Sequence, residues 1–362
     1  MTSLDDLPIR DDLRGQHPYG APQLEVRYAL NTNENTHPVP DDVVDDIVES
    51  IAEVVHGLNR YPDRDFTELR EALAGYLGHG LTADQLWAAN GSNEILQQIL
   101  QAFGGSGRSV LGFPPTYSMH SIIAAGTYTE WVTAERDADY ELSPETVVTA
   151  IERLRPDIVF LCAPNNPTGT GVSLATITAA YDAHPGIVVV DEAYAEFMPA
   201  GAPSALTLLP GRERLIVSRT MSKAFAFAGA RVGYLAADAA VIDALRLVRL
   251  PYHLSALTQA AAIAAIRHAD EMLATVADIS AQRDRLATGL IGLGYRVLPS
   301  QANFLLVEGF TNAQATWAAL LEDGILVRDV GIAGSLRITA GTAEETTAVV
   351  EAIAALGPGG AA

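Results

Sequence analysis

The stretch SRTMSKAFAFAGARVG, residues 218–233, organises the chain around a lone lysine, Lys223. Two hydroxyl residues, Thr220 and Ser222, precede it, and Arg231 follows. The run before it, residues 214–218, is short, apolar and rich in β-branched side chains, which predicts a buried strand that delivers these groups to a loop. Ligands of open α/β sheets bind at this edge of the sheet. We therefore predict that Lys223 is the reactive centre.

Lys223 is suited to chemistry with aldehydes. A lysine amine that is desolvated, or that lies beside another cation, loses its proton and becomes a nucleophile. Arg231 and the two hydroxyls would then hold an anion, since the guanidinium fork matches the oxygens of a phosphate. On this stretch alone, a surface lysine after an edge strand is the alternative.

Composition limits the class of protein. The 362 residues exceed the size at which one core usually stops growing, and 49% of them are hydrophobic, so we expect a large domain and a smaller one. Lys and Arg number 23 against 44 Asp and Glu, and the net charge of -21 argues against nucleic acid or an anionic membrane as a partner. The single cysteine, Cys162, excludes an intrachain disulfide and a Cys-rich zinc site, and we predict that it is inert.

The N-terminal segment does not resemble a targeting signal. Residues 1–14 are acidic and have no apolar core, and no window approaches a membrane span, so we expect a cytoplasmic protein. Residues 1–37 are polar and predict an arm that lies over another surface, such as a partner subunit. Within the arm, residues 30–35 read LNTNEN, a composition typical of a turn and also suited to recognising a polar ring.

The middle of the chain alternates strands and helices. Apolar periodicity predicts helices at 40–56, 67–76, 95–103, 117–125, 143–154, 173–183 and 239–248. Short apolar runs predict strands at 109–113, 157–162, 187–191, 214–218 and 232–236. This alternation indicates a mostly parallel sheet covered by helices on both faces.

The C-terminal part changes character. Long Ala-rich helices are predicted over 255–293, and strands at 296–298, 303–307, 325–330 and 335–339, which together favour an α+β domain. Thr342 and Glu345 form a capping-box pattern that starts a last helix. The predicted organisation is an arm over 1–37, a large domain over 38–254 and a small domain over 255–362.

Polar groups follow three of the predicted strands, at NNPTG (165–169), at DEAY (191–194) and at the Lys223 segment. Their order and strand context resemble the cofactor site of fold-type I aminotransferases, which use pyridoxal 5'-phosphate (PLP). The resemblance covers nearly the whole chain. It implies an α/β fold in which a mostly parallel seven-stranded sheet lies between helices and a smaller α+β domain follows.

The resemblance also assigns roles around the cofactor ring. Lys223 would condense with the cofactor's aldehyde and later move a proton as general base and acid. Asp191 would pair with the pyridine nitrogen and keep it protonated, so that the ring accepts electrons. Asn166 and Tyr194 would hydrogen-bond the phenolic oxygen, and Tyr117 would stack on the ring.

A second set of residues would hold the cofactor's phosphate. The set comprises the backbone N–H groups of Ser92 and Asn93, which precede an apolar helix, the hydroxyls of Thr220 and Ser222, Arg231, and Tyr61 from the other subunit. A site completed across subunits implies a homodimer with shared active sites.

The similarity is closest to the histidinol-phosphate aminotransferases of the class-II subgroup, especially those of actinobacteria. It implies reversible amino transfer between L-histidinol phosphate and 2-oxoglutarate, with L-glutamate as the other amino acid. Arg337 would bind the anion of either substrate, carboxylate or phosphate. Arg328, and Tyr19 from the partner's arm, would help with the phosphate, and Asn33 and Glu34 would complete the substrate site.

Two positions depart from the family pattern. Thr36 stands where the family usually has proline, and Asn93 replaces a frequent aspartate. An aromatic amino acid aminotransferase is the alternative function, because one arginine binds either anion. A PLP-binding regulator without turnover would lack Arg337. A Ser-x-x-Lys hydrolase would need serine at Thr220. The eight histidines show no metal-like spacing, and residues 103–107 do not fit a dinucleotide fingerprint.

Overall fold

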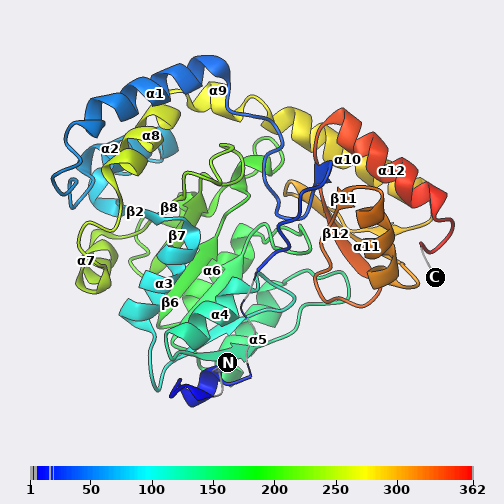
Figure 1. Ribbon diagram of the computed structural model, residues 1–362. Helices are drawn as coiled ribbons and strands as arrows, with labels where there is room; N and C mark the ends of the chain where they lie inside the picture. Colours follow the sequence, from blue (N-terminus) through cyan, green and yellow to red (C-terminus); the bar gives the residue numbers. More distant parts are fainter. Residues whose placement is uncertain (1–2, 4–5, 16–17, 19, 361–362) are drawn as a thin grey trace.

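A large mixed sheet dominates the computed structural model, which describes residues 3, 6–15, 18 and 20–360. Within these residues, seven strands form one sheet in the order β2-β8-β7-β6-β5-β3-β4, with helices on both faces (Figure 1). β8 is antiparallel to both of its neighbours, and the other pairs are parallel. The strands are β2 Leu86–Asn90, β3 Ser109–Gly112, β4 Glu130–Thr133, β5 Ile158–Cys162, β6 Ile187–Asp191, β7 Leu215–Thr220 and β8 Val232–Ala236. The predicted mostly parallel seven-stranded sheet is confirmed.

The central strands form because their apolar runs are covered from both sides. Every residue of β5 and of β7 is buried. Each fully buried Val, Leu, Ile or Phe side chain contributes about 1.5–3 kcal/mol relative to an exposed one. The register pairs Cys162 with Asp191 and Asp191 with Ser218, so the carboxyl ends of the three strands lie side by side.

The sequence pattern did not predict two strands of this sheet, β2 and β4. β2 contains Ala88 and Ala89, which have little strand preference, and it is held in place by pairing with β8. β4 is an edge strand whose residues are exposed or half-buried, so its apolar signal is weak. Tertiary pairing, rather than local preference, selects both strands.

Helices of the N-terminal two thirds cover the sheet. They are α1 Asp41–Val55, α2 Thr67–Leu77, α3 Ser92–Phe103, α4 Met119–Gly126, α5 Pro144–Leu154, α6 Leu174–Ala183, α7 Ala239–Val248 and α8 Ala256–Arg267. Short 3-10 helices lie at Asp11–Leu13, Ala83–Gln85, Ala195–Phe197 and Ala205–Leu208. Ser143 and Ser173 cap α5 and α6 by accepting hydrogen bonds from the backbone of the first turn.

The C-terminal part builds a second core. Its elements are α9 Ala269–Leu273, α10 Val276–Gly292, β9 Arg296–Val297, β10 Phe304–Glu308, α11 Ala313–Glu322, β11 Ile325–Leu326, β12 Ser335–Thr339 and α12 Ala343–Ala355. β12, β10 and β9 form an antiparallel sheet, and β1 Tyr28–Ala29 pairs with β11. The strand predicted over 325–330 is shorter, because only Arg328 continues the pairing, in a bridge to Arg337. The capping box of Thr342 and Glu345 is present.

The buried apolar side chains form separate clusters in the large-sheet part and in the C-terminal part. Buried alanines of α8, Ala262 and Ala265, belong to the core of the large sheet together with Leu69 of α2. Residues from α10 onward, together with Leu30 of the N-terminal arm, form a separate cluster that includes Leu286 and Val307. The first helix after residue 254 therefore packs with the large sheet, and the division at 254 stays a prediction. Among the described residues, no helix is both long and apolar enough to cross a membrane.

Candidate active site

A cavity of about 220 Å³ lies beyond the carboxyl ends of β5, β6 and β7, where a ligand of an α/β sheet binds. Segments from the arm, the large sheet and the C-terminal part all reach it. Its lining consists of Ala21, Asn31, Thr32, Asn33, Ser92, Asn93, Tyr117, Cys162, Asn166, Asp191, Ala193, Tyr194, Thr220, Ser222, Lys223, Arg231, Arg328 and Arg337.

The cavity brings together most of the predicted site residues, but its lining does not include Glu34 or Tyr61. Glu34 is absent from the lining; its carboxylate accepts a hydrogen bond from the Thr32 hydroxyl at 2.7 Å. Tyr61 is 78% exposed and stacks on Tyr252, with 4.3 Å between ring centroids. Tyr19 lies outside the described residues.

Lys223 is the only lysine of the sequence and lies half-buried in the cavity. Its Nζ donates a hydrogen bond to the carbonyl oxygen of Thr32 at 2.8 Å. Burial, followed by the positive charge of Arg337 and of Arg231, lowers the pKa of Lys223 to about 8, although Glu34 opposes the shift. About a tenth of the amine is therefore neutral, and nucleophilic, at pH 7.

Asp191 ends β6 and is 2% exposed. Its Oδ2 lies 3.1 Å from Nε2 of His120, and its Oδ1 accepts a hydrogen bond from the Ser218 hydroxyl at 3.1 Å. These contacts fix the orientation of the carboxylate. The sequence did not indicate a role for His120 or Ser218, because no local pattern connects Asp191 with residues so distant along the chain.

A buried phenol lies beside this carboxylate. The hydroxyl oxygen of Tyr194 accepts hydrogen bonds from Nδ2 of Asn33 at 3.0 Å and from Nδ2 of Asn166 at 3.3 Å. Burial raises the pKa of Tyr194, so the phenol stays protonated and retains a hydrogen to donate. Asn33 has a left-handed backbone, with φ of 55°, and is fixed by Thr339 of β12.

Five groups form an anion cradle, comprising the N–H groups of Ser92 and Asn93, the hydroxyls of Thr220 and Ser222, and Arg231. The two N–H groups lie in the first turn of α3, where they have no intrahelical acceptor. Glycine is required beneath them, because a Cβ at Gly233 would collide with the backbone nitrogen of Ser92. Together they offer a phosphate both hydrogen bonds and positive charge.

Two arginines approach the cavity from adjacent positions of the C-terminal part. Arg337 donates from Nη1 to Oδ1 of Asn166 at 2.7 Å and from Nη2 to the carbonyl oxygen of Asn31 at 2.6 Å. Arg328 is joined to Arg337 by two backbone hydrogen bonds. A second hollow of about 170 Å³ adjoins the cavity, and both arginines line it as well. This edge of the site can hold an anion.

The arm closes the cavity from the other side. Nδ2 of Asn35 donates to the carbonyl oxygen of Ala224 at 3.1 Å and to the Thr275 hydroxyl at 3.0 Å. The sequence pattern did not indicate that Ala21, Asn31, Thr32 and Ala193 line the cavity, and Thr32 acts through a backbone carbonyl that no side-chain pattern reveals. Within the described residues, no group of three or more His, Cys, Asp and Glu side chains could hold a metal ion.

Cys162 also lines the cavity, next to Asp191 in the sheet register. Burial, followed by the charge of Asp191, raises the pKa of its thiol to about 12. The thiol therefore stays protonated near neutral pH and is a poor nucleophile.

Comparison with known proteins places the chain in a family. Residues 28–353 match the family model for aminotransferase class I and II, so the chain belongs to that family. A histidinol-phosphate aminotransferase from Paenarthrobacter aurescens is 59% identical over 98% of this chain and 96% of its own length. Another, from Thermobifida fusca, is 58% identical over 97% and 96% of the two chains.

Solved structures agree with these relatives. A histidinol-phosphate aminotransferase from Sinorhizobium meliloti in complex with pyridoxal 5'-phosphate superposes with a TM-score of 0.82 at 26% identity, over 91% of this chain and 92% of that one. An aspartate aminotransferase from Thermus thermophilus has a TM-score of 0.80 at 23% identity over 96% and 99%. The second likeness shows the shared fold alone.

Proposed function

We propose that the protein is a histidinol-phosphate aminotransferase that uses PLP. It reversibly transfers an amino group between L-histidinol phosphate and 2-oxoglutarate, giving imidazole acetol phosphate and L-glutamate, a step of L-histidine biosynthesis. The observation that carries the proposal is one cavity that unites Lys223, with its lowered pKa, with Asp191, the anion cradle and Arg337. The names of relatives that match nearly the whole chain support the choice of substrate.

The donor set of the cavity fits PLP. The anion cradle would hold the phosphate, Asp191 would pair with the protonated ring nitrogen, and Asn166 and Tyr194 would hydrogen-bond the phenolic oxygen. Tyr117 supplies an aromatic ring, and its hydroxyl donates to Oδ1 of Asn93 at 3.0 Å. When bound, PLP supplies an aldehyde that captures amino groups and a ring that accepts electrons.

Lys223 performs the proton transfers. Its neutral Nζ would hold the cofactor's aldehyde group, and the same nitrogen would serve as general base toward the substrate carbon that bears the amino group. Asp191, which His120 and Ser218 orient, would hold the ring nitrogen in its protonated form. Each pKa unit of that preference corresponds to about 1.4 kcal/mol.

Arg337 and Arg328 bind the substrate anion. A guanidinium makes charge-assisted hydrogen bonds to the carboxylate of glutamate and to the phosphate of histidinol phosphate, so the same edge accepts both substrates in turn. Asn33 and Glu34, together with Tyr19 from the partner's arm, complete this part of the site.

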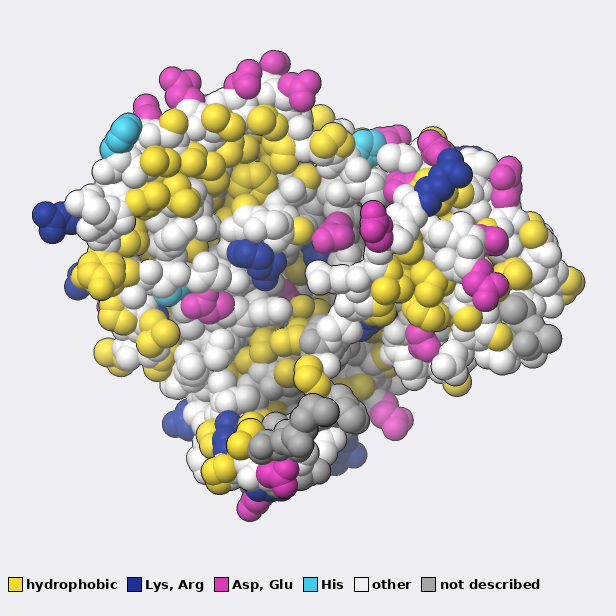
Figure 2. All heavy atoms as spheres, viewed as in Figure 1, with side chains coloured by type: hydrophobic (Ala, Val, Ile, Leu, Met, Phe, Trp, Pro, Cys, Tyr) yellow, Lys and Arg dark blue, Asp and Glu magenta, His cyan; other side chains and the backbone are white. Residues whose placement is uncertain are grey.

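The protein acts as a homodimer in this proposal, because Tyr61 lies outside its own cavity and would reach the phosphate held by a second copy. Figure 2 shows hydrophobic side chains gathered over the face that carries α1, α2 and α8. The large exposed apolar side chains of this region, which we call the apolar face, are Val44, Val48, Val55, Leu58, Tyr61, Leu247, Leu250 and Tyr252. Contiguous apolar surface of this kind marks protein interfaces.

A cytoplasmic location is part of the same proposal, since the single cysteine permits no intrachain disulfide.

Steady-state kinetics test the assignment. With 2-oxoglutarate as acceptor, histidinol phosphate should give a much higher kcat/KM than phenylalanine or tyrosine. The reverse order would instead establish an aromatic amino acid aminotransferase, which the same pair of arginines can serve.

A further inference from the structure

The loop that carries Tyr61, residues 61–66, joins the helical region of α1 to α2. Its last residue, Phe66, is buried in a left-handed conformation and packs edge-on against Trp87, with 4.8 Å between ring centroids. Tyr61 lies at the opposite end of the loop and is 78% exposed. The buried anchor therefore does not by itself fix the direction of the tyrosine.

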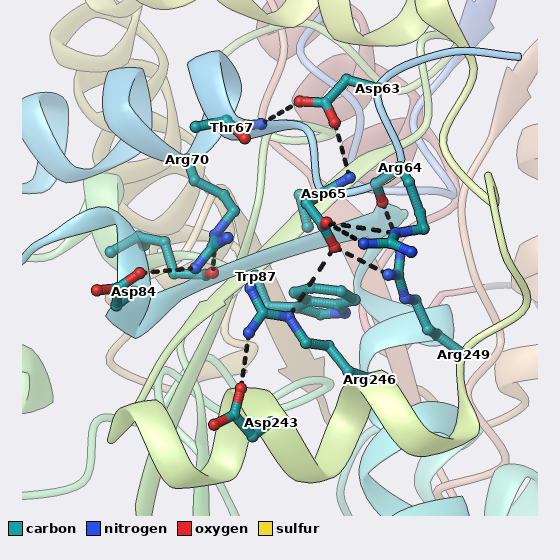
Figure 3. Close-up of polar contacts among 12 residues, drawn as sticks. Asp63, Arg64, Asp65, Thr67, Arg70, Asp84, Trp87, Asp243, Arg246 and Arg249 are labelled. Atoms are coloured by element: carbon teal, nitrogen blue, oxygen red, sulfur yellow. Dashed lines mark hydrogen bonds and ion pairs between the residues drawn. The ribbon is translucent and has the colours of Figure 1, made fainter.

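Arg249, which follows α7, holds the middle of this loop. Its Nη2 lies 2.9 Å from Oδ1 of Asp65, and its Nη1 donates to the carbonyl oxygen of Arg64. Figure 3 shows the Arg249 and Arg246 side chains converging on Asp65, with Trp87 beside them. One guanidinium thus ties a side chain and the main chain of the loop at adjacent residues.

Two residues that follow Arg249 in the sequence, Tyr252 and Gln259, also contact this loop. Nε2 of Gln259 donates to the carbonyl oxygen of Asp63 at 3.1 Å. The ring of Tyr252 stacks on Tyr61 with an interplanar angle of 13°. Residues 249–259 therefore contact the loop at its start and in its middle.

The ionic contact is stronger than a typical surface pair. The Arg249 side chain is 7% exposed and Asp65 is 27% exposed, so the pair is partly shielded from solvent and salt. Burial alone would raise the pKa of Asp65, but Arg64, Arg249 and Arg246 outweigh it, and the pKa is lowered. Arg246 interacts more weakly with Asp65, because the two side chains are 4.0 Å apart and Arg246 pairs with Asp243 at 2.6 Å.

We propose that Arg249, through Asp65 and the carbonyl of Arg64, positions Tyr61 for the cofactor phosphate in the active site of the partner subunit. This inference rests on the proposed function, in which Tyr61 completes the site of a second copy. Arg249 is then a positioning residue that acts in trans, and it does not belong to the cavity of its own chain.

A double-mutant cycle on the dissociation constant of PLP tests the link to Tyr61. Tyr61→Phe removes one hydrogen bond to a charged group and should weaken PLP binding about tenfold. Arg249→Ala alone should weaken PLP binding about fivefold. In the Tyr61→Phe background, the same change should weaken PLP binding by less than about twofold, since the two residues act through one contact. Arg249→Lys, which keeps the charge, should recover part of the loss. Arg246→Ala, which removes the more distant cation and leaves both contacts of Arg249 with the loop, is the matched control and should weaken PLP binding less than Arg249→Ala does.

Hybrid dimers test the direction of the effect. Lys223→Ala leaves a chain without lysine, so a dimer with one such chain has a single site that can bind the cofactor covalently. Arg249→Ala placed on the Lys223→Ala chain should weaken covalent capture of PLP, read from its absorbance, at the intact site. Arg249→Ala placed on the chain that carries Lys223 should leave that site unaffected.

The outcomes separate this inference from the proposed function. An equal loss of affinity in the Tyr61→Phe background, or a loss that follows the chain bearing Lys223, would overturn the inference and leave the proposed reaction intact. Unchanged PLP affinity in Tyr61→Phe itself would overturn both the shared site and the role of Arg249. If Arg249→Ala does not fold, Asp65→Asn serves in the same cycle with the same expected pattern.

Discussion

The cavity around Asp191 and the loop of Tyr61 are built in opposite ways. Asp191 and Tyr194 are almost fully buried, and side chains from distant parts of the same chain hold each of them. Tyr61 is largely exposed, and a cluster of charged residues near the surface supports its loop. The groups proposed for the reaction are thus held within one chain, whereas the proposed completion of the phosphate site depends on an exposed loop and on a partner subunit.

We expect the largest loss of activity from a substitution inside the cavity. Lys223→Ala should abolish the absorbance of lysine-bound cofactor and lower turnover by at least about 10⁴-fold, because the residue supplies both the nucleophile and the proton relay. Borohydride reduction followed by mass spectrometry checks the result. The wild-type chain has one lysine to trap, so a label on a residue other than Lys223 would contradict the assignment.

Removal of an interior anion contact should have a smaller effect. Arg337→Ala should lower kcat/KM for histidinol phosphate about 100-fold, since a hydrogen bond to a charged group is worth about 1.5–3 kcal/mol. Arg337→Lys should lower kcat/KM less, because lysine keeps the positive charge, although it lacks the planar guanidinium that donates two parallel hydrogen bonds. Steady-state kinetics with both amino donors measure the effect. An unchanged kcat/KM in Arg337→Ala would show that the substrate anion binds elsewhere.

Changes to the apolar face should affect assembly and leave the interior intact. Leu247, 85% exposed on α7, should be buried in the dimer. Leu247→Ala should reduce the free energy of dimerisation by about 1 kcal/mol for each side chain removed. Because a two-fold interface contains this residue twice, the dissociation constant of the dimer should rise about 30-fold. Sedimentation measures the dissociation constant. Ile291→Ala, which removes an exposed side chain of α10 outside this face, is the control, and equal weakening by both variants would argue against the proposed interface.

The smallest effect concerns pH. Because the pKa of Lys223 is lowered to about 8, the amine of the apoprotein is mostly protonated at pH 7 and mostly neutral at pH 9. The rate of covalent PLP capture should therefore rise about tenfold over this interval and level off above it. Arg337→Ala removes a nearby cation and should move the midpoint to higher pH. Stopped-flow absorbance checks both expectations, and a rate that falls as the pH rises would contradict them.

Much of the fold was predictable because the local signals agree with the tertiary structure. β5, β6 and β7 are continuous apolar runs, and capping residues mark the starts of α5, α6 and α12. β2 and β4 were not predictable, since one is rich in alanine and the other lies at an edge. Their strand conformation depends on neighbours that the local sequence does not show.

The candidate site follows the same division. Lys223, Asp191 and Asn166 could be selected from the sequence because each comes directly after an apolar run, and parallel strands end at one edge. The contact of His120 with Asp191 and that of the Thr32 carbonyl with Lys223 could not be selected. These pairs are distant along the chain, and only the folded structure brings them within hydrogen-bonding distance.

The sequence by itself determined the available chemistry, because a single lysine, an acidic strand end and paired arginines are properties of residue type and order. Only the tertiary structure decided how these groups behave. Burial and nearby cations lower the pKa of Lys223, two distant partners orient Asp191, and Arg249 holds the loop of Tyr61 outside its own cavity. The physical reason is that desolvation and hydrogen-bond geometry depend on distances in space, which residue order alone does not specify.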